Sequence, residues 1–86
     1  MAPGPQIADD SALFRTRLVS VVTELGGVKA VTEVGDVPAA LDALQGARPD
    51  LVLLDIEMPG GDSLEVLAKA KEGKSTIPVI VLTAFP

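Results

Sequence analysis

The chain has 86 residues and a net charge of −5, and 48% of it is hydrophobic but only 2% aromatic. It can therefore form one small domain whose core is aliphatic, and its 7 scattered Lys and Arg argue against nucleic-acid binding and against docking on an anionic membrane. The absence of cysteine and histidine excludes disulfides, thiolate metal sites, phosphohistidine carriers and serine–histidine hydrolases.

The N-terminal segment is expected to be a flexible stretch, residues 1–4, followed by a short first strand over Pro5–Ala8. It has neither the basic start nor the apolar stretch of a signal peptide, and no run in the chain approaches the roughly 18 residues of a membrane span. We therefore expect a cytoplasmic protein. The first strand must be central if three others surround it, although proline is unfavourable in a central strand.

A helix is predicted from Ser11 to Gly26. Asp10 or Ser11 can cap its start, and glycine can stop its end. Its apolar residues recur at spacings of three and four, which predicts one core-facing side. These residues are Phe14, Leu18, Val21, Val22 and Leu25, while Arg15, Arg17 and Glu24 suit the other faces.

Shorter elements follow in alternation. A strand is predicted over Val28–Val34, and then a helix with Pro38 in its first turn that ends near Gly46. A third helix is expected from about Ser63 to Lys71, where serine can cap the start.

Two continuous apolar runs, Leu51–Leu54 and Val79–Leu82, indicate buried strands of the kind found in parallel sheets covered on both faces. The alternation of four strands with three helices predicts an α/β fold with a doubly wound parallel sheet. In such sheets, binding sites form beyond the carboxyl ends of the strands.

Three acidic residues fall at these strand ends. Asp9 and Asp10 follow the first strand, and Asp55 follows the third. Carboxylates packed together repel one another, so they need a cation or raised pKa values. Oxygen ligands of this kind suit Mg²⁺, and a carboxylate can also act as a nucleophile toward phosphorus.

The chain resembles the receiver domain of two-component response regulators, which has a flavodoxin-like fold. Three segments carry the resemblance: Ile7-Ala8-Asp9-Asp10-Ser11, the run from Pro49 to Gly60, and Val79 to Ala84. The resemblance extends over nearly the whole chain from Ile7. Leu13-Phe14-Arg15 and Thr83-Ala84-Phe85-Pro86 are most similar to receivers joined to a helix-turn-helix DNA-binding domain, which implies transcription regulation.

The resemblance implies a role for each matching residue. Asp55 would accept phosphate from a sensor histidine kinase. Asp10 and Asp55 would bind Mg²⁺ directly, Asp9 through water, and the backbone carbonyl of Glu57 would be a further ligand.

Two residues after the fourth strand complete the implied site. Thr83 would be the switch hydroxyl that turns toward the phosphoryl group, and Ala84 the small residue beside it. The family normally has a phosphate-contacting lysine on its fifth strand, and no lysine of this chain follows the fourth strand. The lysines present are Lys29, Lys69, Lys71 and Lys74.

By the same resemblance, residues 1–86 form a single incomplete receiver domain that lacks the fifth strand and the last two helices. The sequence leaves open whether the chain is naturally short or a stretch of a longer protein. The fourth strand would be an exposed edge, and one sheet face would be uncovered. We therefore expect a homo-oligomer formed through these surfaces.

Two other functions stay open, and neither is favoured over the phosphoacceptor. The first is a pseudo-receiver, which keeps the fold as an interaction or dimerisation module without phosphorylation. The second is an aspartyl-nucleophile phosphatase, suggested by Asp55-Ile56-Glu57, although its second acid is Glu and no enzyme is expected here. Each residue also has a structural interpretation: a helix cap for Asp9 and Asp10, a strand-end polar group for Asp55 and Thr83.

Overall fold

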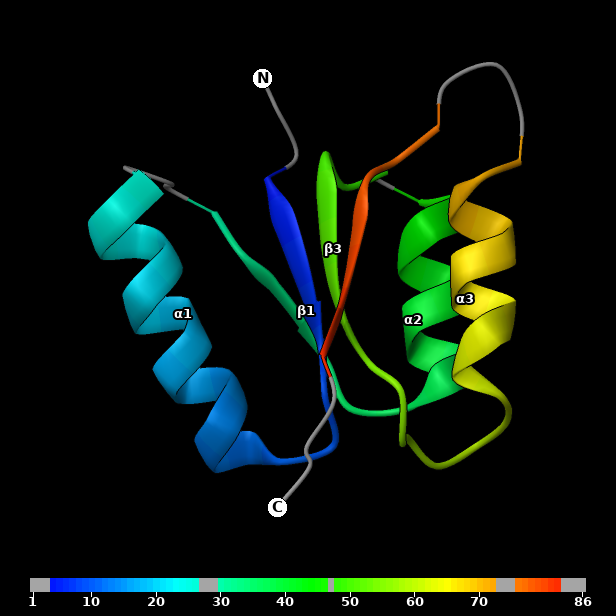
Figure 1. Ribbon diagram of the computed structural model, residues 1–86, viewed down its shortest axis with the longest axis horizontal. Coiled ribbons are helices and arrows are strands. Elements are labelled where there is room, and N and C mark those ends of the chain that lie inside the picture. Colours follow the sequence, from blue (N-terminus) through cyan, green and yellow to red (C-terminus); the bar gives the residue numbers. More distant parts are fainter. Residues whose placement is uncertain (1–3, 27–29, 47, 73–75, 83–86) are drawn as a thin grey trace.

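The computed structural model describes residues 4–26, 30–46, 48–72 and 76–82. Strands and helices alternate strictly along the chain (Figure 1). The elements are β1 (Pro5–Ala8), α1 (Ala12–Gly26), β2 (Thr32–Val34), α2 (Val37–Gln45), β3 (Leu51–Asp55), α3 (Ser63–Ala70) and β4 (Val79–Leu82). The four strands form one parallel sheet in the order β2-β1-β3-β4, which confirms the predicted doubly wound α/β fold.

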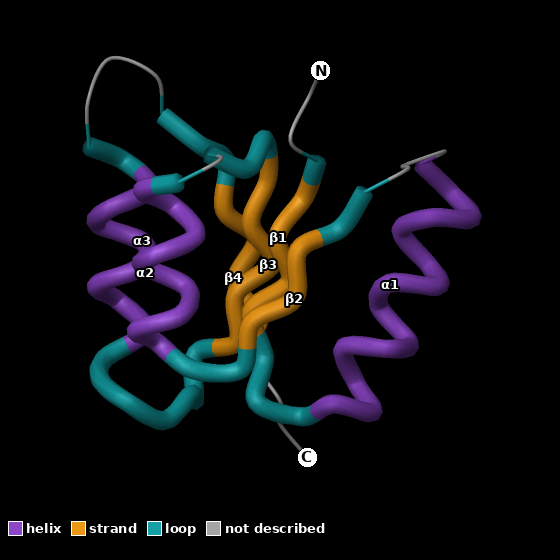
Figure 2. Tube along the Cα trace, turned by 180° about the vertical axis from the view of Figure 1, so that it is seen from behind, coloured by secondary structure: helices purple, strands orange, loops and turns teal. Residues whose placement is uncertain are grey.

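The helices lie on both faces of this sheet. Helix α1 covers one face, and α2 and α3 pack side by side on the other, as Figures 1 and 2 show from opposite sides. Because every strand is parallel, the carboxyl ends of all four meet at one edge of the sheet. That edge is where the sequence predicts a site.

Strand β1 is short and central, as predicted, and all of its residues are buried. Its first residue, Pro5, is the register partner of Leu51 in β3 and has no N–H to donate. Pairing with β2 therefore begins one residue later, at Gln6 and Thr32. The prediction that the second strand includes Ala30 and Val31 was wrong, because β2 starts at Thr32, and residues 27–29 lie outside the described residues.

The core lies between the sheet and the α2–α3 layer. Its members are aliphatic, as the composition requires, and most have almost no exposed surface. They are Ala8, Val37, Ala40, Leu44, Val52, Leu54, Met58, Val66, Ala70 and Ile77. Burial of this side of the sheet supplies most of the hydrophobic stabilisation of the domain.

Capping residues set the starts of the helices. Asp36 accepts a hydrogen bond from the Ala39 N–H (2.8 Å) and caps α2, with Pro38 in the first turn as predicted. Helix α3 is capped by Asp62, whose carboxylate accepts from the Leu64 N–H (2.9 Å), and not by Ser63. Ser11 caps α1 by accepting from the Phe14 N–H (3.1 Å). None of the described helices has the length and hydropathy needed to cross a membrane.

Helix α1 is less buried than its periodicity predicts. No residue of α1 is fully buried, and Phe14 and Leu25 are 43% and 84% exposed. The helix packs against β1. The expected core-facing side exists, but among the described residues only part of it is covered.

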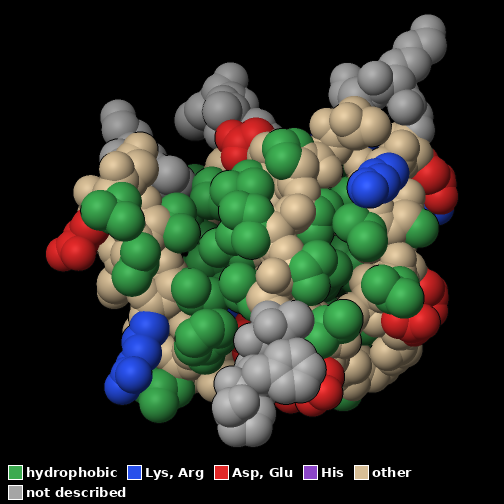
Figure 3. Space-filling view, viewed as in Figure 1, with side chains coloured by type: hydrophobic (Ala, Val, Ile, Leu, Met, Phe, Trp, Pro, Cys, Tyr) green, Lys and Arg blue, Asp and Glu red, His purple; other side chains and the backbone are tan. Residues whose placement is uncertain are grey.

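Strand β4 forms one edge of the sheet. The apolar run alone predicted buried side chains, and this was wrong for Ile80 and Val81, which are 52% and 42% exposed. The receiver resemblance predicted an exposed edge strand, and β4 is one among the described residues. The prediction held for β3, which lies between β1 and β4. Figure 3 looks onto the β4 edge and shows apolar side chains gathered on both sides of it.

Candidate functional site

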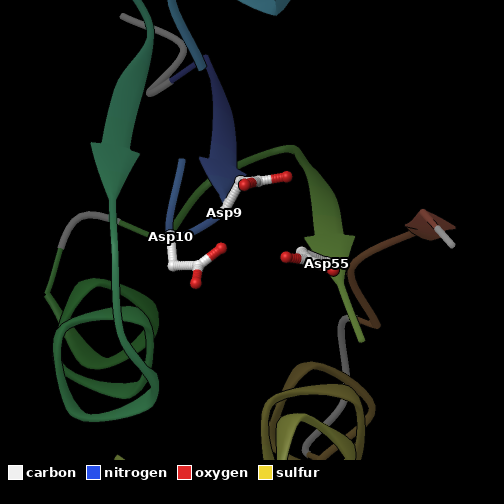
Figure 4. Close-up of side chains that lie close together, drawn as sticks. All are labelled: Asp9, Asp10 and Asp55. Atoms are coloured by element: carbon white, nitrogen blue, oxygen red, sulfur yellow. The ribbon is translucent and has the colours of Figure 1, made fainter. Parts of the chain in front are cut away.

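Three aspartates meet at the carboxyl edge of the sheet. Ala8 of β1 pairs with Leu54 of β3, so the residues that follow them, Asp9 and Asp55, are neighbours across the two strands. Asp10 comes next in the chain and turns its carboxylate toward Asp55 (Figure 4). One carboxylate oxygen from each aspartate lies within 4.8 Å of the others, so the predicted constellation of acids is present.

The turn between β1 and α1 holds Asp9 tightly. Its backbone N–H donates to the carbonyl of Val34 in β2 (3.0 Å), which extends the sheet pairing by one residue. Its Oδ1 accepts from the Ser11 N–H (2.8 Å), and the residue is buried. Asp10 is exposed, so the pair presents one fixed, buried carboxylate and one that faces solvent.

Asp55 is the last residue of β3 and is buried. Its Oδ1 accepts a hydrogen bond from the Glu57 N–H (3.1 Å). Burial raises the pKa of Asp55, the Glu57 hydrogen bond opposes this rise, and the negative charges of Asp9, Asp10 and Glu57 add to it. The surroundings of Asp55 therefore destabilise its ionised form relative to its protonated form.

A divalent cation fits this donor set. Mg²⁺ takes oxygen ligands and is bound by a few carboxylates together with water, which matches three clustered aspartates of which one is exposed. A cation there would also relieve the repulsion that raises the pKa of Asp55. The residues that could hold it are Asp9, Asp10 and Asp55.

The loop after Asp55 is fixed against α2. The carbonyl of Pro59 accepts from the Val37 N–H (3.0 Å), which joins this loop to the start of the helix. Gly60 has φ of +89°, and a Cβ on it would lie 2.7 Å from Cδ of Pro38. Only glycine fits both the backbone angle and the contact, so the loop that carries Glu57 has a defined path.

A comparison with known protein families identifies the family to which the chain belongs. Residues 6–86 match the response regulator receiver domain family. This chain is a receiver domain of the response regulator family. The resemblance found in the motifs is thereby confirmed, together with the receiver-type fold.

Several curated relatives of this receiver domain are much longer proteins. It is 37% identical over 79 residues to a protein-glutamate methylesterase/protein-glutamine glutaminase of Treponema pallidum, covering 92% of this chain and 20% of that protein. It is also 37% identical to the transcriptional regulatory protein PdtaR of Mycobacterium tuberculosis, with 92% and 38% covered. A positive alginate biosynthesis regulatory protein of Pseudomonas aeruginosa is 39% identical, with 91% and 32% covered. The receiver therefore spans only a fifth to two fifths of these relatives.

Solved structures agree with the fold. The N-terminal domain of a response regulator receiver protein from Methanoculleus marisnigri is 36% identical, with a TM-score of 0.79 over 96% of this chain and 68% of that one. The response regulator domain of Thermotoga maritima CheB is 26% identical, with a TM-score of 0.83 over 98% and 62%. The parallel sheet and its carboxyl edge are thus those of known receivers.

The other predicted site residues are less completely placed. Glu57 lies in the loop after β3 with its side chain exposed, and its N–H contacts Asp55, but its carbonyl as a metal ligand stays a prediction. Thr83 and Ala84 lie outside the described residues. The lysines that the structure describes, Lys69 and Lys71, lie at the carboxyl end of α3, which Figure 1 places at the opposite end of the sheet from Asp55.

Arg15 is a site neighbour that the sequence analysis missed. It was placed on a face of α1 away from the core, but its Nη1 donates to the backbone carbonyl of Asp9. Its Nε lies 3.4 Å from Oε1 of Glu33 in β2. The contacts join three separate elements, so helical periodicity could not have found them.

Proposed function

We propose that this receiver domain accepts a phosphoryl group on Asp55 and that the donor is a phosphohistidine of a sensor histidine kinase. An oxygen of the Asp55 carboxylate attacks phosphorus and forms the new P–O bond while the P–N bond to the imidazole breaks. The electron pair of the P–N bond stays on the imidazole nitrogen, which takes up a proton from solvent. The observation that carries this proposal is the meeting of Asp9, Asp10 and Asp55 at one edge of the sheet.

The surroundings of Asp55 suit a nucleophile. Its pKa is raised mainly by burial, so its carboxylate is more basic than an ordinary aspartate. The Glu57 N–H holds one carboxylate oxygen, Oδ1, and so fixes the orientation of the group. A fixed and basic oxygen at an open strand end is the arrangement that attack on phosphorus requires.

We propose that Mg²⁺ is the cofactor, held directly by Asp10 and Asp55, through water by Asp9, and by the carbonyl of Glu57. When bound, it supplies positive charge against the oxygens of the transferring group. In the same proposal, the Thr83 hydroxyl contacts the phosphoryl group and Ala84 leaves space beside it.

The biological role proposed is that of a switch and not of an enzyme. Phosphorylation adds negative charge at the strand ends, where three acids already repel one another, and this biases the domain toward a second conformation. Regulatory proteins among the relatives support a cytoplasmic module that controls transcription through a separate output domain.

The test is incubation of the chain with Mg²⁺ and a small acyl phosphate, followed by intact-mass measurement. We expect a gain of one phosphoryl group that depends on Mg²⁺ and disappears in Asp55→Asn. Asp42→Asn is the matched control, because Asp42 is an exposed aspartate on α2. No mass gain in the wild-type chain would favour the pseudo-receiver alternative, and turnover of a phosphomonoester lost in Asp55→Asn would favour the phosphatase.

We also propose self-association through β4. The strand pairs with β3 on one side only among the described residues, and Ile80 and Val81 are exposed beside its unpaired edge. An exposed apolar edge is a template for pairing with another strand. A second copy of this chain offers the same edge, so two copies can pair symmetrically.

A further inference from the structure

Arg15 joins three segments of the chain at Asp9, one of the clustered acids. It lies in the first turns of α1, its Nη1 donates to the backbone carbonyl of Asp9 at the end of β1, and its Nε lies 3.4 Å from Oε1 of Glu33 in β2. Its side chain is 20% exposed, whereas that of Glu33 is 45% exposed. The Arg15 side chain as a whole is therefore largely covered, and its guanidinium donates to two acceptors.

The chain leaves room for this guanidinium at Gly35. A Cβ at that position would lie 3.1 Å from Nη1 of Arg15 and 3.8 Å from the carbonyl oxygen of Asp9. The φ of Gly35 is not positive, so the backbone angle itself does not require glycine. Glycine here serves the close approach of Arg15 to the end of β1.

We propose that Arg15 is a positioning residue for the phosphoacceptor site, an inference that rests on the function proposed above. By holding the Asp9 carbonyl against β2, it fixes the turn that presents Asp9 and Asp10 to Asp55. Such a restraint opposes the mutual repulsion of the three clustered carboxylates, of which that of Asp10 is exposed. A planar guanidinium can hold two acceptors at once, which a lysine ammonium does less well.

The direction in which Mg²⁺ affinity changes when Arg15 is removed separates a positioning role from a purely electrostatic role and a purely structural role. A positive charge near the cluster competes with a divalent cation, so a purely electrostatic Arg15 would weaken Mg²⁺ binding, and its removal would strengthen it. A purely structural Arg15 would change the melting temperature and leave the Mg²⁺ affinity of the folded chain unchanged. A positioning Arg15 makes the affinity fall when it is removed.

The experiment is a titration of the folded chain with Mg²⁺, in which binding is monitored by the NMR signals of the backbone amides of Asp9 and Asp10. NMR is suitable because the chain has no Trp or Tyr for fluorescence. We expect Arg15→Ala to weaken Mg²⁺ binding about tenfold, as loss of a residue that orients metal ligands commonly does. Arg15→Lys should recover part of the affinity, and Arg17→Ala, an exposed arginine on the same helix, should leave it unchanged.

Gly35→Ala provides a test with no change in charge. Its added methyl group presses on Nη1 of Arg15, so Mg²⁺ binding should weaken in the same direction as in Arg15→Ala. If Arg15→Ala fails to fold, Arg15→Lys and Gly35→Ala decide the matter. Unchanged or tighter Mg²⁺ binding in the folded variants would overturn the positioning role.

Phosphorylation of the wild-type chain by an acyl phosphate is measured in parallel. A wild-type chain that binds Mg²⁺ but gains no phosphoryl group contradicts the proposed function, while the affinities still decide the role of Arg15. A wild-type chain that is phosphorylated, with Arg15→Ala equal to it in affinity, contradicts only the positioning role. A wild-type chain that does not bind Mg²⁺ contradicts both.

Discussion

Ala8 in β1 and Leu54 in β3 are partners in the parallel sheet, and this pairing sets Asp9 beside Asp55. Adjacent strands in a sheet lie about 4.8 Å apart, so acids at the ends of two paired strands lie close together. The acidic cluster is thus a direct product of strand register. Four predictions concern its energetics and the packing that supports it.

In metal-free buffer, we expect Asp55→Asn to stabilise the domain. The substitution removes a buried charge that faces Asp9, Asp10 and Glu57, while an amide of the same shape can still accept from the Glu57 N–H. A gain on the order of 1 kcal/mol corresponds to a rise in melting temperature of about 4–8 °C for a domain of this size. Thermal melts by circular dichroism measure this change. A lower melting temperature would contradict the view that the Asp55 charge destabilises the folded domain.

Stability should also depend on pH through Asp55. Its pKa in the folded domain is raised above that in the unfolded chain, so the folded state binds the proton more tightly. Between these two pKa values the unfolding free energy therefore falls as pH rises, and above the folded pKa the loss is complete. Urea unfolding at several pH values should show this fall in the wild-type chain relative to Asp55→Asn. An identical pH dependence in both proteins would contradict it, as would a difference that Asp42→Asn reproduces.

The buried amide of Gln6 is expected to lower the free energy of unfolding of the domain. Its side chain is fully buried in β1, its Nε2 donates to the Ala40 carbonyl over 3.4 Å, and its Oε1 has no hydrogen-bond partner among the described residues. We expect Gln6→Met, which has similar size and no polar atom, to raise the free energy of unfolding by about 1 kcal/mol. Gln45→Met, at an exposed position of α2, is the control, and a destabilised Gln6→Met would show that the amide is needed.

The loop after β3 should be intolerant of a side chain at Gly60. Alanine there would adopt φ near +89° and place its Cβ 2.7 Å from Cδ of Pro38, so something must shift. A residue held in such a backbone conformation costs about 1–3 kcal/mol. Chemical unfolding of Gly60→Ala measures this cost. The control is Gly46→Ala, because a Cβ at Gly46 would lie 3.6 Å from its nearest atom, the carbonyl oxygen of Asp42. Equal stabilities would mean that the loop can take another path.

Much of this fold was predictable because local patterns agreed with the global architecture. The apolar run of β3 and the proline and glycine that bound α2 each predicted an element that the structure contains, and α3 was predicted with the wrong capping residue. Asp9, Asp10 and Asp55 could be brought together on paper because parallel strands end at one edge. Their clustering required only the strand order.

The remainder depends on packing between distant elements, which periodicity does not encode. Arg15 has the spacing of a solvent-facing helical residue, yet its partners are Asp9, just after β1, and Glu33 in β2. The apolar runs of β3 and β4 look alike in sequence, and only the family's strand order indicated that β3 has a strand on each side while β4, among the described residues, has one on one side. Gln6 looked like an ordinary strand residue, and its burial follows from the central place of β1.

Self-association through β4 has its own test. We expect light scattering to show a dimer or larger species whose population rises with concentration, and Ile80→Lys or Val81→Lys to shift it toward monomer, since a charge on an edge strand discourages pairing. Leu64→Lys, at an exposed apolar residue of α3, should leave it unchanged. A monodisperse wild-type monomer at high concentration would rule this association out.

The phosphoacceptor role is tested most directly by locating the modified residue. The chain is treated with Mg²⁺ and an acyl phosphate, reduced with borohydride, and digested, since an aspartyl phosphate is reduced to homoserine and so marks its position. We predict homoserine at position 55, with Asp9 and Asp10 unmodified. Modification at Asp9 or Asp10 instead, or an unmodified wild-type chain, would contradict the account.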